Sequence, residues 1–156
     1  MAEIVKSGMD PEALDAVDKS VRETVQGILE RVRTEGTAAV REYSEKFDKW
    51  NPESFRLSDA EIQACIDSLP EQAIDDIKFA QAQIRGFAEA QKASMLPVEV
   101  QTIPGVTLGH RHIPVKSVGC YVPGGRYPMV ASAHMSVVTA RVAGVDRVIA
   151  CTPPTD

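Results

Sequence analysis

Cysteine is scarce in this sequence of 156 residues. The three cysteines, Cys65, Cys120 and Cys151, are widely spaced and include no CxxC pair. An odd number with this spacing excludes a disulfide framework and gives no thiolate zinc site. We therefore expect reduced thiols.

An excess of positive charge is also lacking. The 17 Lys and Arg residues are outnumbered by 22 Asp and Glu residues, which gives a formal net charge of -5 at pH 7. Proteins that bind nucleic acid or acidic membrane surfaces need clustered Lys and Arg. We therefore expect neither nucleic acid nor a membrane as a partner.

Long apolar runs are absent as well, since no stretch approaches the roughly 18 residues that a transmembrane helix needs. Glu3, Lys6 and Asp10 stand where a signal peptide would have its apolar core. These absences predict a cytoplasmic protein. The chain contains no internal repeat and no low-complexity segment, and its 44% hydrophobic content is typical of an ordinary globular domain.

Helical periodicity dominates residues 1–95. Between residues 10 and 34, apolar side chains from Leu14 to Val32 recur at spacings of three and four, which predicts an amphipathic helix that stops at Gly36. The same spacing predicts three further helices, over residues 37–48, 58–69 and 71–93. Ser58 followed by Glu61 is the signature of a capping box at the start of the third helix.

Strand patterns begin after Pro97. Residues 98–102 and 106–112 alternate between apolar and polar around a Pro-Gly turn, which predicts a β-hairpin. The next segments are an apolar run at 117–122, the loop Pro123-Gly124-Gly125, a helix at 130–143 and an apolar run at 145–151. This order predicts a right-handed βαβ crossover between two parallel strands.

The predicted fold class is α/β. A helical region over residues 1–95 precedes the start of a Rossmann-like domain over residues 96–156, which contains the hairpin and a first βαβ unit. A single βαβ unit leaves a sheet edge and part of a sheet face open. We therefore expect an N-terminal fragment, or a chain that another polypeptide completes, and we expect it to associate.

The glycine loop between the strand and the helix is a candidate binding site. Glycine lets a ligand approach the backbone closely, and the start of a helix attracts anions. Tyr121, just before the loop, could stack on a base or a ribose, or could be a rim residue of the core. The chain contains neither GxGxxG nor GxxxxGK[ST], so a purely structural turn at Gly124 and Gly125 stays an alternative.

Arg126 follows the glycines, and Tyr127 lies next to it. An arginine fork could hold a carboxylate, a phosphate or a sulfonate through two parallel hydrogen bonds. The alternative is a loop arginine that only water contacts. We take Arg126 and His134, which lies on the helix predicted after the loop, as candidate substrate contacts.

Other reactive residue types give weaker signals. His110 and His112 are two positions apart and could share a metal ion on one face of a strand, but a third ligand and an HExxH motif are lacking, so we assign no metal site to this chain. Cys151 could act as a thiolate toward an aldehyde, but without a neighbouring base a buried, inert cysteine is favoured. We interpret Glu12, Asp75 and Asp76 as parts of solvated helix faces.

The loop and its flanks closely resemble the histidinol dehydrogenase family. The resemblance rests on Ser117-Val-Gly-Cys-Tyr-Val-Pro-Gly-Gly125, Pro128, Met135, Ala140-Arg-Val-Ala-Gly144 and Cys151-Thr-Pro-Pro154. Upstream, Val40-Arg-Glu-Tyr-Ser-Glu-Lys-Phe-Asp48 is similar to that family's N-terminal helical signature, and Pro104-Gly-Val106 is similar to its approach to the first sheet. These segments cover most of the chain.

The resemblance implies an NAD-dependent, zinc-assisted dehydrogenase that oxidises a primary alcohol through an aldehyde to a carboxylate. Members are homodimers with two incomplete Rossmann-like domains. The family's NAD-contacting tyrosine falls on Tyr121, and Gly124 and Gly125 would shape the loop near the active site. Because the family's zinc ligands and Glu-His acid/base pair belong to later regions, no catalytic residue and no metal ligand is assigned here. We expect the 156-residue chain alone to be inactive.

The loop departs from the biosynthetic histidinol dehydrogenases, which usually follow the two glycines with a small hydroxyl residue. Here Arg126-Tyr127-Pro128-Met129 follows, which resembles the sulfopropanediol dehydrogenase branch of the family. That branch oxidises 2,3-dihydroxypropane-1-sulfonate to sulfolactate, and an added arginine suits an acidic alcohol. We expect this substrate, with L-histidinol as the alternative.

A function of another class is also compatible with the sequence. The amphipathic helices of residues 10–93 could bind a partner as a non-catalytic interaction module, with the glycine loop serving only as a turn. A degraded or split relative that keeps its helices without the chemistry is a third possibility.

Overall fold

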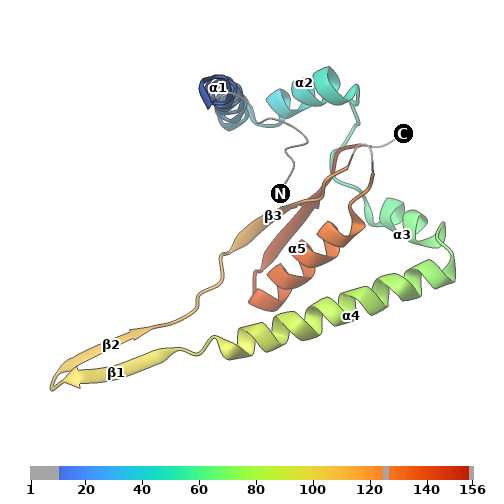
Figure 1. The fold of residues 1–156 in the computed structure, drawn as a ribbon. Coiled ribbons are helices and arrows are strands. Elements are labelled where there is room, and N and C mark those ends of the chain that lie inside the picture. The colour runs from blue at the N-terminus through green and yellow to red at the C-terminus, as the bar shows by residue number, and fades with distance from the viewer. Residues whose placement is uncertain (1–10, 125–126, 155–156) are drawn as a thin grey trace, which may run out of the picture. The chain divides into compact units, whose positions relative to one another are not determined.

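The computed structural model describes residues 11–124 and 127–154, with side chains from residue 18 onward. The elements follow the order α1 (Pro11–Glu35), α2 (Thr37–Asp48), α3 (Asp59–Asp67), α4 (Glu71–Ser94), β1 (Val98–Ile103), β2 (Val106–His110), β3 (Ser117–Tyr121), α5 (Val130–Ala143) and β4 (Arg147–Cys151) (Figure 1). This order confirms the predicted helices, hairpin and βαβ unit. No helix in the described ranges is both long and apolar enough to span a bilayer.

The chain forms two compact units that meet in sequence at Glu53 and Ser54. The first contains α1 and α2, and the second contains the remaining helices and the four strands. The domain boundary expected after residue 95 stays a prediction.

The first unit is a helical hairpin that turns at Gly36. This residue has a φ of 60°, in the left-handed region that glycine adopts without strain. Ala39 on α2 is fully buried, whereas Val21 and Leu29 on the predicted apolar stripe of α1 are exposed. Only part of that stripe is therefore covered.

An arginine on α1 holds the two helices together. The Arg31 guanidinium donates to both carboxylate oxygens of Glu35 on α1 and of Glu42 on α2, at 2.6–3.0 Å. Its carbon Cζ also lies 5.1 Å from the ring centroid of Tyr43. These hydrogen bonds from Arg31 lower the pKa of Glu35 and the pKa of Glu42.

The second unit begins with the predicted capping box. Ser58 Oγ accepts a hydrogen bond from the backbone N–H of Glu61 at 3.3 Å, and the Ser58 backbone N–H donates to Glu61 Oε2 at 2.7 Å. Two backbone donors at the start of α3 are thereby satisfied. Pro70 then acts as the N-cap of α4.

The β1–β2 hairpin has one apolar face. Cross-strand pairs put Val98 opposite His110 and Val100 opposite Leu108, and an irregularity after Gln101 aligns Ile103 with Val106. The strand β2 ends at His110, so the expected continuation to His112 is wrong. His110 already pairs with Val98, the first residue of β1, and the preceding proline has no N–H to extend the ladder.

The strands β3 and β4 form a two-stranded parallel sheet, with Ser117 opposite Arg147 at one end and Tyr121 opposite Cys151 at the other. The helix α5 packs against both strands and against α4 (Figure 1). The small core consists of Ala88, Cys120, Val138 and Val145 in this unit. Val145 and Asp146 belong to the helix end rather than to β4, because the Val145 N–H donates to the Ala140 carbonyl.

The capping box predicts a measurable loss on mutation. Replacing Ser58 with alanine (Ser58→Ala) removes the acceptor for the Glu61 N–H and should lower the free energy of unfolding by about 1 kcal/mol, as measured by chemical denaturation. Ser68→Ala is the matched control, because the Ser68 hydroxyl donates to the Cys65 carbonyl at the other end of α3. Equal losses in the two variants would contradict the importance of the capping box.

The Arg31 contacts predict a pH-dependent contribution to stability. Because the folded-state pKa values of Glu35 and Glu42 are lowered, this contribution is present above the ordinary carboxyl pKa and is lost as the pH falls through the lowered values. Arg31→Met should therefore lower the melting temperature at pH 7, and its difference from the parent should shrink toward pH 2. Arg33→Met is the control for a pair within one helix: among the described residues Arg33 pairs with Glu30 and lowers the pKa of that carboxyl, so a smaller loss with the same pH trend is expected. A difference that does not change with pH would contradict the assignment.

Candidate functional site at the carboxyl edge of the parallel strands

The parallel register brings two distant loops to the same sheet edge. Tyr121 and Cys151 end their strands opposite each other. The ladder continues one step further, because the Val122 N–H donates to the Cys151 carbonyl at 2.8 Å. The loop after β3 and the loop after β4 therefore start from a shared, fixed edge, which is where α/β sheets generally bind ligands.

Gly124 lies directly against the loop after β4. A Cβ added to Gly124 would stand 3.3 Å from Cγ and Cδ of Pro153 and 3.3 Å from Oγ1 of Thr152. This spacing is too tight for a side chain unless the rigid proline ring moves. Packing against Pro153 thus explains the glycine structurally.

The helix α5 starts at this edge. The Met129 N–H donates to the Pro123 carbonyl at 3.1 Å, which ties the loop to the helix start. Among the residues that the structure describes, no side chain caps this terminus, and the first turn contains no acidic residue. The amides of the first turn and the positive end of the helix dipole therefore favour an anion there.

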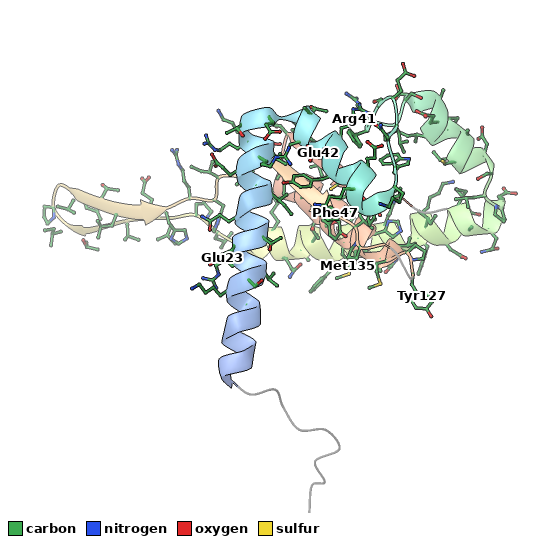
Figure 2. The ribbon with its side chains drawn as sticks, turned by 90° about the horizontal axis from the view of Figure 1, so that it is seen from above. Glu23, Arg41, Glu42, Phe47, Tyr127 and Met135 are labelled. Carbon is green, nitrogen blue, oxygen red and sulfur yellow. The ribbon has the colours of Figure 1, made fainter. Side chains whose placement is uncertain are left out.

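Two tyrosines flank the glycine loop. Tyr121 is 63% exposed and Tyr127 is 72% exposed, and Figure 2 shows the Tyr127 side chain pointing away from the ribbon. The exposure of Tyr121 at a strand end favours a role outside the core. Gly125 and Arg126, which were also predicted to bind cofactor and substrate, lie outside the described residues.

His134 is directed toward the neighbouring helix. Its Nδ1 atom lies 3.5 Å from the side-chain nitrogen of Gln81 on α4, and the contact is partly buried. The structure therefore gives His134 a helix-packing contact, and its role as a substrate contact stays a prediction. Sequence spacing could not reveal the pairing, because 53 positions separate the two residues.

Cys151 is exposed, so the expectation of a buried cysteine is wrong for this residue; Cys120, on the neighbouring strand, is the buried one. Cys151 pairs with Tyr121 and Cys120 pairs with Ala150, so the alternation of side chains along a strand puts Cys151 on the sheet face opposite to that of Cys120. The rings of His110 and His112 lie 5.5 Å apart, edge to face. Within the described residues, no three His, Cys, Asp or Glu side chains group closely enough to hold a metal ion.

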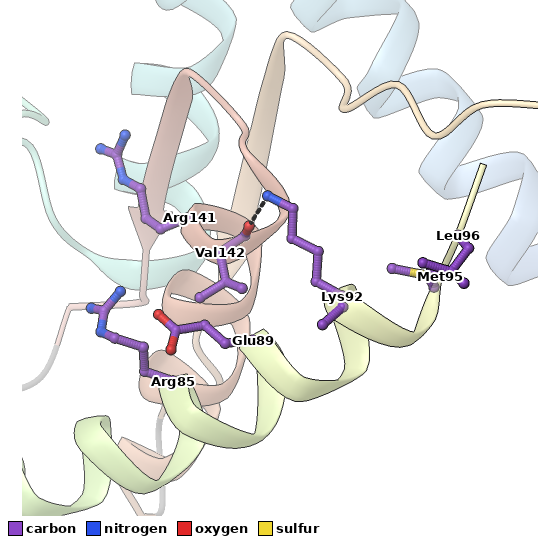
Figure 3. A pocket seen from close by; sticks show the side chains of 8 residues that line it. Arg85, Glu89, Lys92, Met95, Leu96, Arg141 and Val142 are labelled. Carbon is purple, nitrogen blue, oxygen red and sulfur yellow. Dashed lines mark hydrogen bonds between the residues drawn. The ribbon is translucent and has the colours of Figure 1, made fainter.

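A groove of about 620 Å³ lies between the ends of α4 and α5 (Figure 3). Two of its three cations serve the end of α5: Lys92 Nζ donates to the Val142 carbonyl at 2.7 Å, and Arg141 donates to the Asp146 carbonyl at 3.0 Å, whereas Arg85 also lines the groove. Cations at a helix C-terminus satisfy carbonyls that would otherwise lack a partner. This groove is therefore explained by helix capping.

Two residues at the carboxyl edge were missed by the sequence analysis. Thr152 and Pro153 contact Gly124, although they follow the second strand and not the glycine loop. The predicted βαβ unit could have indicated them, because the residues that follow its two parallel strands meet at one edge of the sheet.

The Gly124 contact predicts a steric effect. Gly124→Ala must displace Pro153 or the loop before α5, and should lower the free energy of unfolding by about 1 kcal/mol in a denaturant titration. Gly119→Ala, on β3, is the control because nothing lies within 4 Å of the added Cβ. If the Gly119→Ala loss matches or exceeds that of Gly124→Ala, the packing explanation is wrong.

Comparison with known proteins supports the family resemblance of the glycine loop and its flanking segments. Residues 13–156 match the family model described as histidinol dehydrogenase. The chain is 56% identical over 154 residues to a histidinol dehydrogenase homolog of Shouchella clausii, covering 99% of this chain and 36% of the relative. It is 46% identical over 140 residues to the sulfopropanediol 3-dehydrogenase of Ruegeria pomeroyi, covering 90% of this chain and 32% of the relative.

A solved structure agrees with these matches. The histidinol dehydrogenase of Elizabethkingia anophelis superposes with a TM-score of 0.77 at 28% identity, covering 97% of this chain and 32% of that one. The chain thus spans about a third of the length of the relatives it matches. With a family model that matches nearly all of its residues, the chain belongs to the histidinol dehydrogenase family.

Proposed function

We propose that this chain is the N-terminal part of an NAD-dependent, zinc-assisted dehydrogenase. The enzyme oxidises a primary alcohol through an aldehyde to a carboxylate, and its preferred substrate is 2,3-dihydroxypropane-1-sulfonate. The observation that carries the proposal is the carboxyl edge of β3 and β4, where an exposed tyrosine, a bare glycine and an uncapped helix start meet in a chain of this family.

The residues at this edge fit part of a dinucleotide. Tyr121 offers an exposed aromatic face to a base or ribose, Gly124 offers backbone without a side chain, and the start of α5 offers amides that no described side chain caps to a phosphate. These features support a Rossmann-like use of the βαβ unit. NAD supplies the acceptor for the hydride, while this part of the chain holds and orients the cofactor.

The described residues do not fit zinc, since none of their side chains group into a ligand set. We therefore propose that the zinc ligands and the acid/base pair belong to other regions of the enzyme. The proposal includes a cytoplasmic homodimer whose partner is a small alcohol rather than nucleic acid or a membrane, and the 156-residue chain alone is inactive.

The substrate assignment rests on the loop after Gly124. An arginine at position 126 adds a cation that can hold a sulfonate through two hydrogen bonds, whereas a cationic amino alcohol gains nothing from it. The relative from Ruegeria pomeroyi, named for sulfopropanediol, supports this choice. L-Histidinol is the alternative, supported by the 43% identity to the histidinol dehydrogenase of Methanosarcina barkeri.

The test uses the protein expressed from its own gene, with zinc and NAD present. NADH formation should be faster with 2,3-dihydroxypropane-1-sulfonate than with L-histidinol when kcat/KM values are compared. Arg126→Ser should raise the KM for the sulfonate about tenfold or more, because a charged hydrogen-bonding partner is lost. Arg111→Ser, which removes an exposed arginine outside the loop, is the matched control and should leave KM unchanged.

Three other outcomes would contradict the proposal in different ways. A preference for L-histidinol would overturn the substrate assignment and leave the dehydrogenase in place. An unchanged KM in Arg126→Ser would remove the role of the arginine. No NADH formation with either alcohol would overturn the enzymatic function and favour the non-catalytic interaction module.

A further inference from the structure

We propose that His110 and His112 form a two-histidine binding site for a divalent ion of a late first-row transition metal, with Cu²⁺ as the preferred ion. The pair belongs to the β1–β2 hairpin and the segment that follows it, not to the sheet of β3 and β4. The site therefore does not depend on the proposed dehydrogenase function. Water completes the coordination, because the described residues supply no group of three His, Cys, Asp or Glu ligands.

The two imidazole rings lie close enough to share one ion. Their centroids are 5.5 Å apart, and their planes are inclined by 72°. Bonds from imidazole nitrogen to a transition-metal ion are about 2.0–2.1 Å long, so two rings that share an ion have centres about 5–6 Å apart. Both residues are exposed, so an ion in solution can reach them. Rotation about side-chain bonds then suffices to direct both rings at the ion.

A backbone carbonyl prepares His110 as a ligand. Its Nε2 atom lies 3.3 Å from the carbonyl oxygen of Leu96. A carbonyl oxygen only accepts hydrogen bonds, so Nε2 carries the proton of the neutral ring and Nδ1 keeps the lone pair. Histidines that bind metal ions typically donate their other ring N–H to an acceptor of this kind, which orients the ring and makes the ligating nitrogen more basic. The Leu96 contact is therefore the arrangement expected around a metal ligand.

The hairpin also holds the backbone of His110 in place. This residue lies opposite Val98 in the antiparallel ladder, where β2 ends and β1 begins. The preceding residue, Gly109, approaches the Val98 carbonyl so closely that a Cβ would overlap its oxygen. The two strands are thus in tight contact next to the ligand. A ligand on a fixed element loses less conformational freedom when it binds an ion.

The type and number of ligands favour copper(II). Imidazole nitrogen suits Cu²⁺, Ni²⁺ and Zn²⁺, and the affinity of such ligands is highest for Cu²⁺. Two nitrogens and two waters fit the tetragonal geometry of Cu²⁺, whereas structural Zn²⁺ sites take four protein ligands. Arg111, between the two histidines in the sequence, adds a positive charge that opposes a cation. We therefore expect a micromolar Kd rather than a tighter one.

The test uses the untagged protein expressed from its own gene, saturated with zinc and titrated with Cu²⁺ against glycine as a competing chelator. His110→Gln keeps a donor for the Leu96 carbonyl and removes the Nδ1 ligand, and it should raise the Kd for Cu²⁺ about tenfold or more. His112→Gln should have the same effect, because one ion needs both rings. Nitrogen hyperfine splitting in the electron paramagnetic resonance spectrum should indicate two imidazoles in the parent and one in each variant.

Two controls separate a shared ion from isolated histidines. His134→Gln removes the third histidine of the chain, which contacts Gln81, and should bind Cu²⁺ within about twofold of the parent. The double variant His110→Gln/His112→Gln should lose less binding free energy than the sum of the two single losses, because either loss already breaks the chelate. All variants keep the three cysteines, so copper on thiols contributes equally. Melting temperatures without copper check that each variant is folded.

Every other outcome overturns the inference. If each single variant keeps a copper site of parental affinity, the two histidines bind separately. If the parent binds copper no better than the double variant, the pair holds no ion and any copper is adventitious. An equal loss in His134→Gln places the site elsewhere. None of these measurements involves NADH or an alcohol, so their failure leaves the proposed function standing, and a lack of dehydrogenase activity leaves the copper site standing.

Discussion

The parallel ladder between β3 and β4 is the interaction on which the candidate site depends. It fixes Tyr121 opposite Cys151 and continues through the hydrogen bond from Val122 to the Cys151 carbonyl. Because both strands end at the same level, the loops that follow them must pack against each other. The contact between Gly124 and Pro153 is the result, and without the ladder neither loop would have a defined position.

The ladder in turn depends on the helices that cover it. The helix α5 packs on both strands, and α4 packs on α5. The Lys92 ammonium on α4 donates to the Val142 carbonyl in the last turn of α5 and so connects the two helices at one end. The contact between Gln81 and His134 connects them again further along. The site therefore rests on the two strands, on α5, which covers them, and on α4, which packs against α5, although the buried core is small.

Local signals in the sequence predicted much of this architecture. The Ser58–Glu61 capping box, the helix stop at Gly36 and the Pro-Gly turn of the hairpin act over a few residues, so a pattern of a few residues suffices to find them. The exposure of Cys151 and the partner of His134 depend on contacts between distant segments. Propensity and spacing carry no information about such contacts, and the family resemblance supplied only Tyr121 and the glycines.

The two ends of α5 differ in a way that bears on the chemistry of the site. At its C-terminal end, Arg141 and Lys92 donate to backbone carbonyls, and Gly144 closes the helix in the left-handed conformation. At its N-terminal end no described side chain caps the first-turn amides, and the nearby prolines cannot donate. Among the described side chains, Lys92 caps the C-terminal end of the helix and none caps its N-terminal end. Since the amides at a helix start attract anions, the N-terminal end of α5 favours an anionic ligand.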